Sequence, residues 1–209
     1  IRFHILFKLI PLINPNSSEI NNSKFSFATD FAEQNLGSKL GVSRTDGTGH
    51  SSSYYGYISG GGLGKSGMTS GNTIQKFPYA SDTDTLSSVG TLSVVTTGPA
   101  GQNSDGSGYT SGGRNPTASP STMLGTVSKF SFASDGNASN VCSLSINRYA
   151  VSGSSSTVDG YSAGGGTAIT PPADVGTNRV DKFPFASETN ATSVGALTLN
   201  WGWTAGFQQ

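Results

Sequence analysis

Six acidic or amide residues with calcium-binding chemistry recur at equivalent places in the sequence. A calcium loop needs further oxygen ligands and a bidentate glutamate, which short pairs spaced at i and i+2 lack. Asp and Asn also favour tight turns, because their side chains hydrogen-bond the adjacent backbone. The pairs are therefore predicted to be turns, and neither a metal site nor a cofactor is expected. The residues are Asp82, Asp84, Asp135, Asn137, Glu188 and Asn190.

The residues that transition metals and hydrolases require are few. The chain has one cysteine, Cys142, and two histidines, His4 and His50, in unrelated settings, which does not favour zinc or copper. The apolar neighbours of Cys142 indicate a small buried residue rather than a reactive thiol. Residues 60–66 resemble a phosphate-binding loop only superficially, because Ser59 stands where the first glycine is required. With no helix predicted, no nucleophile elbow is expected either, and the sequence predicts a protein that is not an enzyme.

Aromatic and polar residues outside the recurring phrases are the candidates for recognition. Exposed tyrosine or tryptophan side chains suit contact with sugar or protein, although packing inside the fold explains each of them equally well. Residues 63–72, 114–125 and 167–177 differ in length and composition between copies, as binding loops on a rigid scaffold do. The predicted binding residues are Tyr54, Tyr55, Lys65, Arg114, Asn115, Trp201 and Trp203.

The composition and the distribution of charge favour neither a nucleic-acid partner nor a membrane span. Twelve basic and twelve acidic residues cancel, and no basic stripe follows the chain, so nucleic acid is not a predicted partner. The only strongly apolar run, residues 1–13, is too short to span a bilayer, where about 20 apolar residues are needed. Its alternation of Phe3, Ile5 and Phe7 with other residues has the period of a strand.

Two phrases that recur along the chain must position all of these residues. The phrase Lys-Phe-x-(Phe or Tyr)-Ala begins at Lys24, Lys76, Lys129 and Lys182, which are 52, 53 and 53 residues apart. The phrase Gly-Tyr-x-(Ser or Ala)-Gly-Gly begins at Gly56, Gly108 and Gly160, at intervals of 52 residues. Self-similarity at such a period is the signature of a solenoid or a propeller. A single domain over residues 1–209 is therefore predicted.

Each copy is predicted to contain four short strands, which is the composition of a propeller blade. The two aromatic residues of the Lys-Phe phrase stand at i and i+2, so both point to one face of a strand. We expect these pairs to pack between neighbouring blades. Pro78 and Pro184 interrupt the phrase in two copies, and because proline cannot donate to a ladder, a bulge or an unpaired edge is predicted there.

The order of these phrases resembles the kelch repeat. One copy runs through Tyr57-Ile-Ser-Gly-Gly61, Ile74 to Tyr79, the turn Asp82 to Thr85 and Val89 to Leu92. The tryptophan that usually follows the turn in kelch blades is replaced by Val89, Val141 and Val194, so the blades are kelch-like. The sequence from Lys182 to Thr198 is also similar to repeats in structural and tail proteins of marine bacteriophages.

The resemblance implies an all-β, kelch-like β-propeller of about four four-stranded blades. The strand Arg2 to Ile10 is expected to complete the blade of Trp201 to Gln209, which removes the exposed edges of a linear array. The function expected from the resemblance is a non-enzymatic structural or adhesive module of a virion or another extracellular assembly. Its partners would be other structural proteins or a host surface glycan or protein, and a homo-oligomer is compatible with this. An intracellular kelch-type scaffold for other proteins is the alternative.

Overall fold

The computed structural model describes residues 21–24, 34–39, 44–63, 71–80, 86–168 and 175–200. Every regular element within these residues is a β-strand. β1 (Asn21–Lys24) and β2 (Gln34–Lys39) form a two-stranded antiparallel sheet. The rest of the described chain is organised as three four-stranded antiparallel sheets with two short additional ladders. The prediction of an all-β chain is confirmed.

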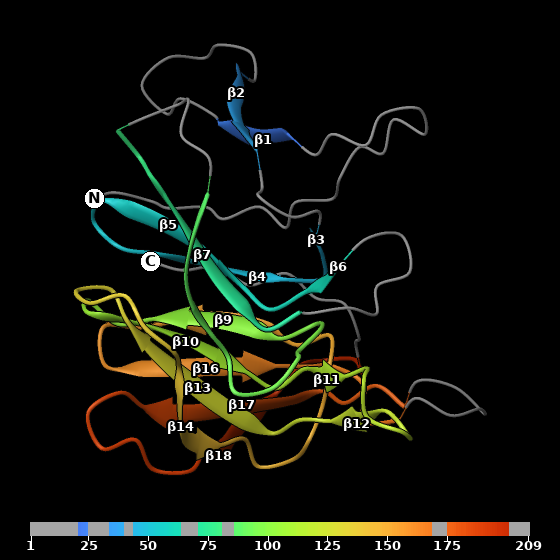
Figure 1. Ribbon diagram of the computed structural model, residues 1–209. Helices are drawn as coiled ribbons and strands as arrows, with labels where there is room; N and C mark the ends of the chain where they lie inside the picture. The colour runs from blue at the N-terminus through green and yellow to red at the C-terminus, as the bar shows by residue number, and fades with distance from the viewer. Residues whose placement is uncertain are drawn as a thin grey trace.

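The three large sheets repeat one plan, in which four consecutive long strands pair as a meander (Figure 1). Sheet I holds β4 (Thr48–Ser51), β5 (Tyr55–Ser59), β7 (Thr73–Pro78) and β8 (Ser87–Thr91). Sheet II holds β9 (Ala100–Asn103), β10 (Ser107–Ser111), β13 (Thr126–Ser131) and β14 (Ser139–Ser143). Sheet III holds β15 (Ser152–Ser155), β16 (Asp159–Ala163), β17 (Arg179–Pro184) and β18 (Thr192–Ala196). The four strands predicted for each copy are confirmed in these three sheets.

Short ladders extend one end of the sheets. β3 (Arg44–Thr45) pairs with β6 (Gly62–Leu63), and β11 (Arg114–Asn115) pairs with β12 (Thr122–Met123). The segment 114–125, predicted to be a variable loop, is therefore a small hairpin (Figure 1).

The first strands of the three sheets lie side by side, with β9 between β4 and β15. Glycine makes this approach possible. A Cβ atom on Gly101 would lie 2.5 Å from the Gly49 carbonyl oxygen, and one on Gly153 would lie 2.2 Å from the Gly101 carbonyl oxygen. Any side chain at these positions would separate the sheets.

Aromatic rings fill the space between consecutive sheets, as predicted from the Lys-Phe phrase. Tyr57 of sheet I lies on Phe130 and Phe132 of sheet II, with ring centroids 5.6 and 4.8 Å away. The contact repeats one period later, where Tyr109 of sheet II lies on Phe183 and Phe185 of sheet III, at 5.8 and 4.7 Å. The tyrosine of the Gly-Tyr phrase is thus the partner that the Lys-Phe phrase packs against. Cys142 is buried in the second of these clusters, as predicted.

Of the two alternatives predicted for the prolines, the bulge is wrong and the unpaired position is confirmed. Pro78 and Pro184 are the last residues of β7 and β17, at a place where the neighbouring outer strand has already stopped pairing. Their missing N–H groups therefore cost no ladder bond. The register shifts lie elsewhere in the same sheets, and each leaves one residue of the outer strand without a partner: Val89, Val141 and Val194. A bulge on an outer strand twists that strand away from further pairing.

Candidate functional site

The residues predicted for binding do not form one site. Tyr54 and Tyr55 lie in the turn that enters β5, whereas Arg114 and Asn115 follow the end of the equivalent strand β10. The two pairs therefore belong to opposite ends of the sheets. Lys65, Trp201 and Trp203 lie outside the described residues.

Tyr54 and Tyr55 line an open pocket of about 500 Å³ in sheet I. Tyr54 is 77% exposed, and its ring stands in solvent at the edge of this hollow. The opposite wall comes from the end of β7 and the residues that follow it. We call this hollow the tyrosine pocket; its lining residues are Ser53, Tyr54, Tyr55, Pro78, Tyr79 and Ala80.

Ser52, two residues before Tyr54, stabilises the turn that carries the two tyrosines. The Ser52 hydroxyl oxygen accepts hydrogen bonds from the backbone N–H groups of Tyr54 and Tyr55, at 3.4 and 3.0 Å. The Ser52 backbone N–H donates to the Tyr55 carbonyl oxygen at 2.9 Å. Such a side-chain-to-backbone turn fixes the chain direction without a glycine. Ser104 and Ser156 close the equivalent turns of sheets II and III by the same backbone bond.

The charge next to the pocket is neutralised. Lys76 Nζ lies 5.0 Å from the centre of the Tyr55 ring and 2.8 Å from each carboxylate oxygen of Asp135 in sheet II. The hydrogen bond to Asp135 raises the pKa of Lys76. Burial raises the pKa of Tyr79 to about 12, so its phenol is neutral at physiological pH. The pocket therefore presents aromatic rings and neutral hydroxyl groups.

Sequence analysis missed Tyr79 as a pocket residue, although a signal for it was present. The other described copies of the Lys-Phe phrase carry Phe132 and Phe185 at this position, so the hydroxyl group is peculiar to sheet I. The inter-sheet role of the turn acids was also missed: Lys129 pairs with Glu188 at 2.5 Å, 59 residues on, as Lys76 pairs with Asp135. Constant separations between unlike charges in different copies were the available signal.

At the opposite end, Arg114 and Asn115 are engaged within the fold. The backbone of Arg114 exchanges hydrogen bonds with Thr97 at 2.9 and 2.8 Å, and its guanidinium lies 5.7 Å from the centre of the Tyr149 ring of the next repeat. The Asn115 side-chain oxygen accepts from the N–H and hydroxyl groups of Thr117 at 3.0 and 2.8 Å. These contacts favour the structural interpretation of both residues.

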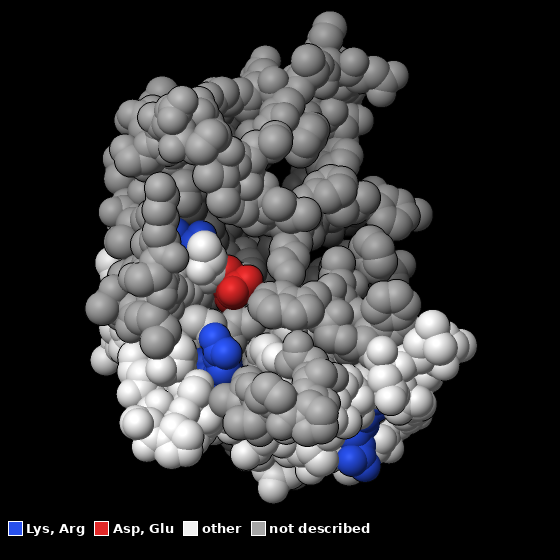
Figure 2. Space-filling view, turned by 90° about the vertical axis from the view of Figure 1, so that its right-hand side faces the viewer, with Lys and Arg blue, Asp and Glu red and all other residues white. Residues whose placement is uncertain are grey.

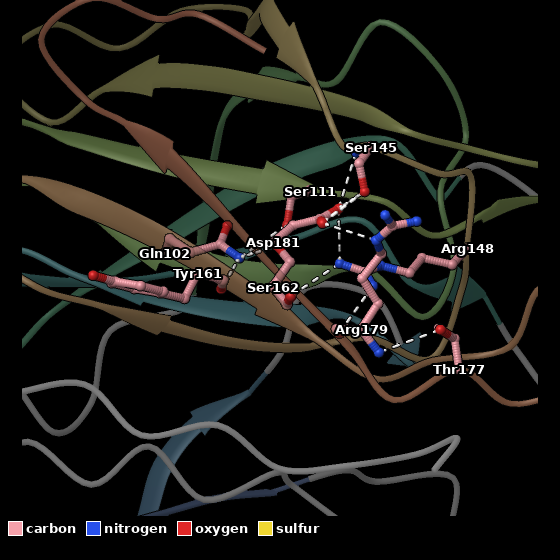
Figure 3. Close-up of polar contacts among 9 residues, drawn as sticks. All are labelled: Gln102, Ser111, Ser145, Arg148, Tyr161, Ser162, Thr177, Arg179 and Asp181. Atoms are coloured by element: carbon pink, nitrogen blue, oxygen red, sulfur yellow. Dashed lines mark hydrogen bonds and ion pairs between the residues drawn. The ribbon is translucent and has the colours of Figure 1, made fainter. Parts of the chain in front are cut away.

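A buried cluster of charges fastens the segment between β14 and β15 to sheet III (Figure 3). Arg148 and Asp181, both 0% exposed, form an ion pair at 3.1 Å. Arg148 also donates to the carbonyl oxygens of Ser162 and Arg179, and the Ser145 hydroxyl donates to Asp181 at 2.6 Å. With both charges paired and hydrogen-bonded, this cluster is a structural link rather than a reactive site.

A second buried polar cluster surrounds His50. The imidazole lies 2.8 Å from the Ser59 hydroxyl oxygen and 3.3 Å from the Gln102 carbonyl oxygen, and it meets the Phe130 ring edge-on. Burial lowers the pKa of His50 to about 4, so the ring is neutral. Within the described part of the chain, the imidazole is bonded to Ser59, Thr110 and Gln102 and to no carboxylate, so the cluster lacks the third member of a catalytic triad.

The sequence Gly160-Tyr-Ser-Ala-Gly164 matches the Gly-x-Ser-x-Gly pattern around a hydrolase nucleophile, but its conformation is not that of a nucleophile elbow. Ser162 lies inside strand β16 and is fully buried. Its hydroxyl is 2.8 Å from that of Ser111 and accepts from the Gln102 amide at 3.0 Å (Figure 3). A nucleophile elbow instead exposes its serine on a turn between a strand and a helix.

Charged side chains are scattered over the described surface. On the face shown in Figure 2, acidic atoms lie in a hollow with basic side chains above and below them, and the coloured atoms form no continuous basic stripe. Among the described residues, no three His, Cys, Asp or Glu side chains gather as metal ligands would. Nor does that part of the chain contain a helix long and apolar enough to cross a membrane.

Comparisons with known proteins relate the chain to others by fold. No family model matches the sequence, and no curated protein matches it. Among solved structures, the one described as "Structure of YjhT" superimposes with a TM-score of 0.65 at 12% sequence identity. The superposition covers 82% of this chain and 57% of that chain, so this protein spans little more than half the length of its structural neighbour. At this identity the similarity concerns the fold alone.

Proposed function

We propose that this protein is a non-enzymatic structural or adhesive module of a virion or another extracellular assembly, built as a kelch-like β-propeller with a recognition pocket at one end. One observation carries the proposal. Three of the positions at which sheet I differs from both sister sheets bring a tyrosine to the same pocket: Tyr54, Tyr55 and Tyr79. Accessible side chains that vary on a repeated, rigid framework are suited to binding.

The propeller part of the proposal rests on the contacts between sheets. Sheets I and II each present a tyrosine and a lysine toward the next sheet, which contributes an aromatic pair and an acidic side chain to the contact. Sheet III presents Tyr161 and Lys182 in the same places. Closure of a ring of four blades would require an aromatic pair opposite Tyr161. The sequence offers Phe25 and Phe27, which lie outside the described residues, as do both strands predicted to share the last blade.

Closure is tested by comparing Tyr161→Ala with Tyr109→Ala. Tyr109 is 1% exposed between sheets II and III, and its truncation should cost about 3–5 kcal/mol of unfolding free energy. In a closed ring Tyr161 packs equivalently, so its truncation should cost a similar amount in chemical denaturation. A loss within about 0.5 kcal/mol is typical of a surface site and would contradict closure.

The assembly role is tested by locating the protein. Particles purified on a density gradient and the cytosol of the producing cells are compared by quantitative mass spectrometry. Enrichment in the particles, resistant to a salt wash, is the expected result. Recovery from the cytosol alone would contradict the proposal and support an intracellular scaffold for other proteins.

A further inference from the structure

The tyrosine pocket differs from the equivalent places of the sister sheets in more than one residue. Where sheet I has Tyr54 and Tyr55, sheet II has Gly106 and Ser107 and sheet III has Val158 and Asp159. The backbone has the same path in all three sheets. A serine closes each turn, and the third strand of each sheet ends opposite that turn. The three tyrosines are therefore not required by the framework.

Tyr55 packs partly against the core cluster that contains Tyr57, but the packing of the fold needs neither the Tyr54 ring nor the Tyr79 hydroxyl group. Phe132 and Phe185 fill the position of Tyr79 in sheets II and III and stack on Tyr57 and Tyr109 without a hydroxyl group. Tyr54, at 77% exposed, is the most exposed large hydrophobic side chain of the described residues. A ring held in solvent by a rigid turn supports no core, and such rings commonly serve as contact surface for a ligand.

The electrostatics of the pocket indicate the charge of its ligand. All six described lining residues are uncharged, and the nearest ammonium group, that of Lys76, is already bonded to both oxygens of Asp135. An anionic ligand would have to compete with Asp135 for Lys76, and a cationic ligand would meet no carboxylate among the described lining residues. A neutral ligand loses no such interaction.

We infer that the tyrosine pocket binds a neutral sugar residue, with the C–H face of the pyranose ring stacked on tyrosine; this inference rests on the proposed recognition role of the same pocket. A pyranose is apolar on its face and polar at its rim. The pocket matches that pattern, with the exposed ring of Tyr54 as the platform and with phenol and Ser53 hydroxyl groups at its rim.

The test is saturation-transfer NMR on the full chain with defined probes. Lactose, maltotriose, cellotriose and tri-N-acetylchitotriose are the neutral probes, 3′-sialyllactose is the anionic counterpart of lactose, and decaproline represents a peptide. At least one neutral sugar should receive saturation at its ring C–H protons, and sialylation should not strengthen binding. Tyr54→Ala should weaken that binding at least ten-fold. Val158→Ala changes the equivalent exposed position of sheet III and should leave binding unchanged.

Three results would overturn the inference. In the first, no neutral sugar receives saturation. In the second, Tyr54→Ala binds as well as the parent chain, while circular dichroism shows both variants folded. In the third, decaproline alone binds and depends on Tyr54; the pocket would then recognise peptide, and the recognition role would survive without the sugar. If the chain binds a sugar but is found only in the cytosol, the proposed assembly role is contradicted and the sugar site is still supported.

Discussion

Tyr57 in sheet I stacks on Phe132 in sheet II, with ring centroids 4.8 Å apart and ring planes inclined by 25°. One period later Tyr109 and Phe185 have almost the same geometry, at 4.7 Å and 26°. The tyrosine that follows the glycine of one phrase is thus paired with the last aromatic residue of the other phrase in the next copy. The contacts between sheets therefore repeat with the same period as the sequence.

Truncating this packing should destabilise the whole domain. Phe130 is 3% exposed and contacts both Tyr57 and His50, so Phe130→Ala should lower the unfolding free energy by about 3–5 kcal/mol. Urea denaturation followed by tyrosine fluorescence measures this loss. Val158→Ala, at a 63% exposed position, is the control and should change stability by less than about 0.5 kcal/mol. Equal midpoints for the two variants would mean that these rings are not core.

The buried ion pair should behave as a coupled unit. Asp181→Ser alone leaves the Arg148 guanidinium buried without its counter-charge, which typically costs about 3–5 kcal/mol. Sheet II carries Thr96 and Ser128 at the equivalent positions, both buried and uncharged. The double variant Arg148→Thr/Asp181→Ser copies that solution and should lose clearly less than the sum of the single losses in a double-mutant cycle. Additive losses would contradict direct coupling of the pair.

Stability should fall with acid through the titration of His50. Its pKa is about 4 in the folded protein and 6.5 in the unfolded chain, so the unfolded chain binds the proton first as the pH drops. The titration of His50 therefore removes about 3 kcal/mol of unfolding free energy. The loss begins as the pH falls below 6.5 and is complete by about pH 4. Unfolding free energies measured from pH 7 to 4 test this.

His50→Gln is the matched variant, because Gln102 occupies the equivalent position in sheet II. The variant should lose most of the pH dependence in this window while keeping the remaining acid sensitivity of the carboxylates. An identical pH profile in parent and variant would show that His50 is not the titrating group.

Relieving backbone strain at Ala150 should stabilise the protein. Asp46, Gly98 and Ala150 occupy equivalent corners before the first strands, with φ of 57°, 63° and 55°. Alanine in the left-handed region is disfavoured by its Cβ, so Ala150→Gly should gain about 0.5–1 kcal/mol in unfolding free energy. Differential scanning calorimetry should show a higher Tm. Gly98→Ala provides the reverse test and should lower the Tm; unchanged or opposite shifts would show that the corner is not strained.

Much of the fold followed from local sequence. The period, the four strands of each copy, the shared face of aromatic pairs such as Phe130 and Phe132, and the burial of Cys142 all depend on alternation within short segments. A strand displays its side chains to alternate faces wherever it is placed, so these features need no knowledge of neighbouring strands. The bulge at Val141 was not predicted, because it depends on the register against β13.

What only the tertiary structure decided are the contacts between strands and between copies. The pairing of Lys76 with Asp135, the burial of His50 against sheet II and the meeting of Tyr54 with Tyr79 join residues from different strands or different sheets. Their separations are set by the twist of each sheet and by how closely its neighbour approaches, which glycines such as Gly101 and Gly153 permit. Hence the sequence by itself determined the repeating unit and its faces, whereas strand pairing brought the pocket residues of sheet I together and the stacking of units determined which side chains meet between sheets.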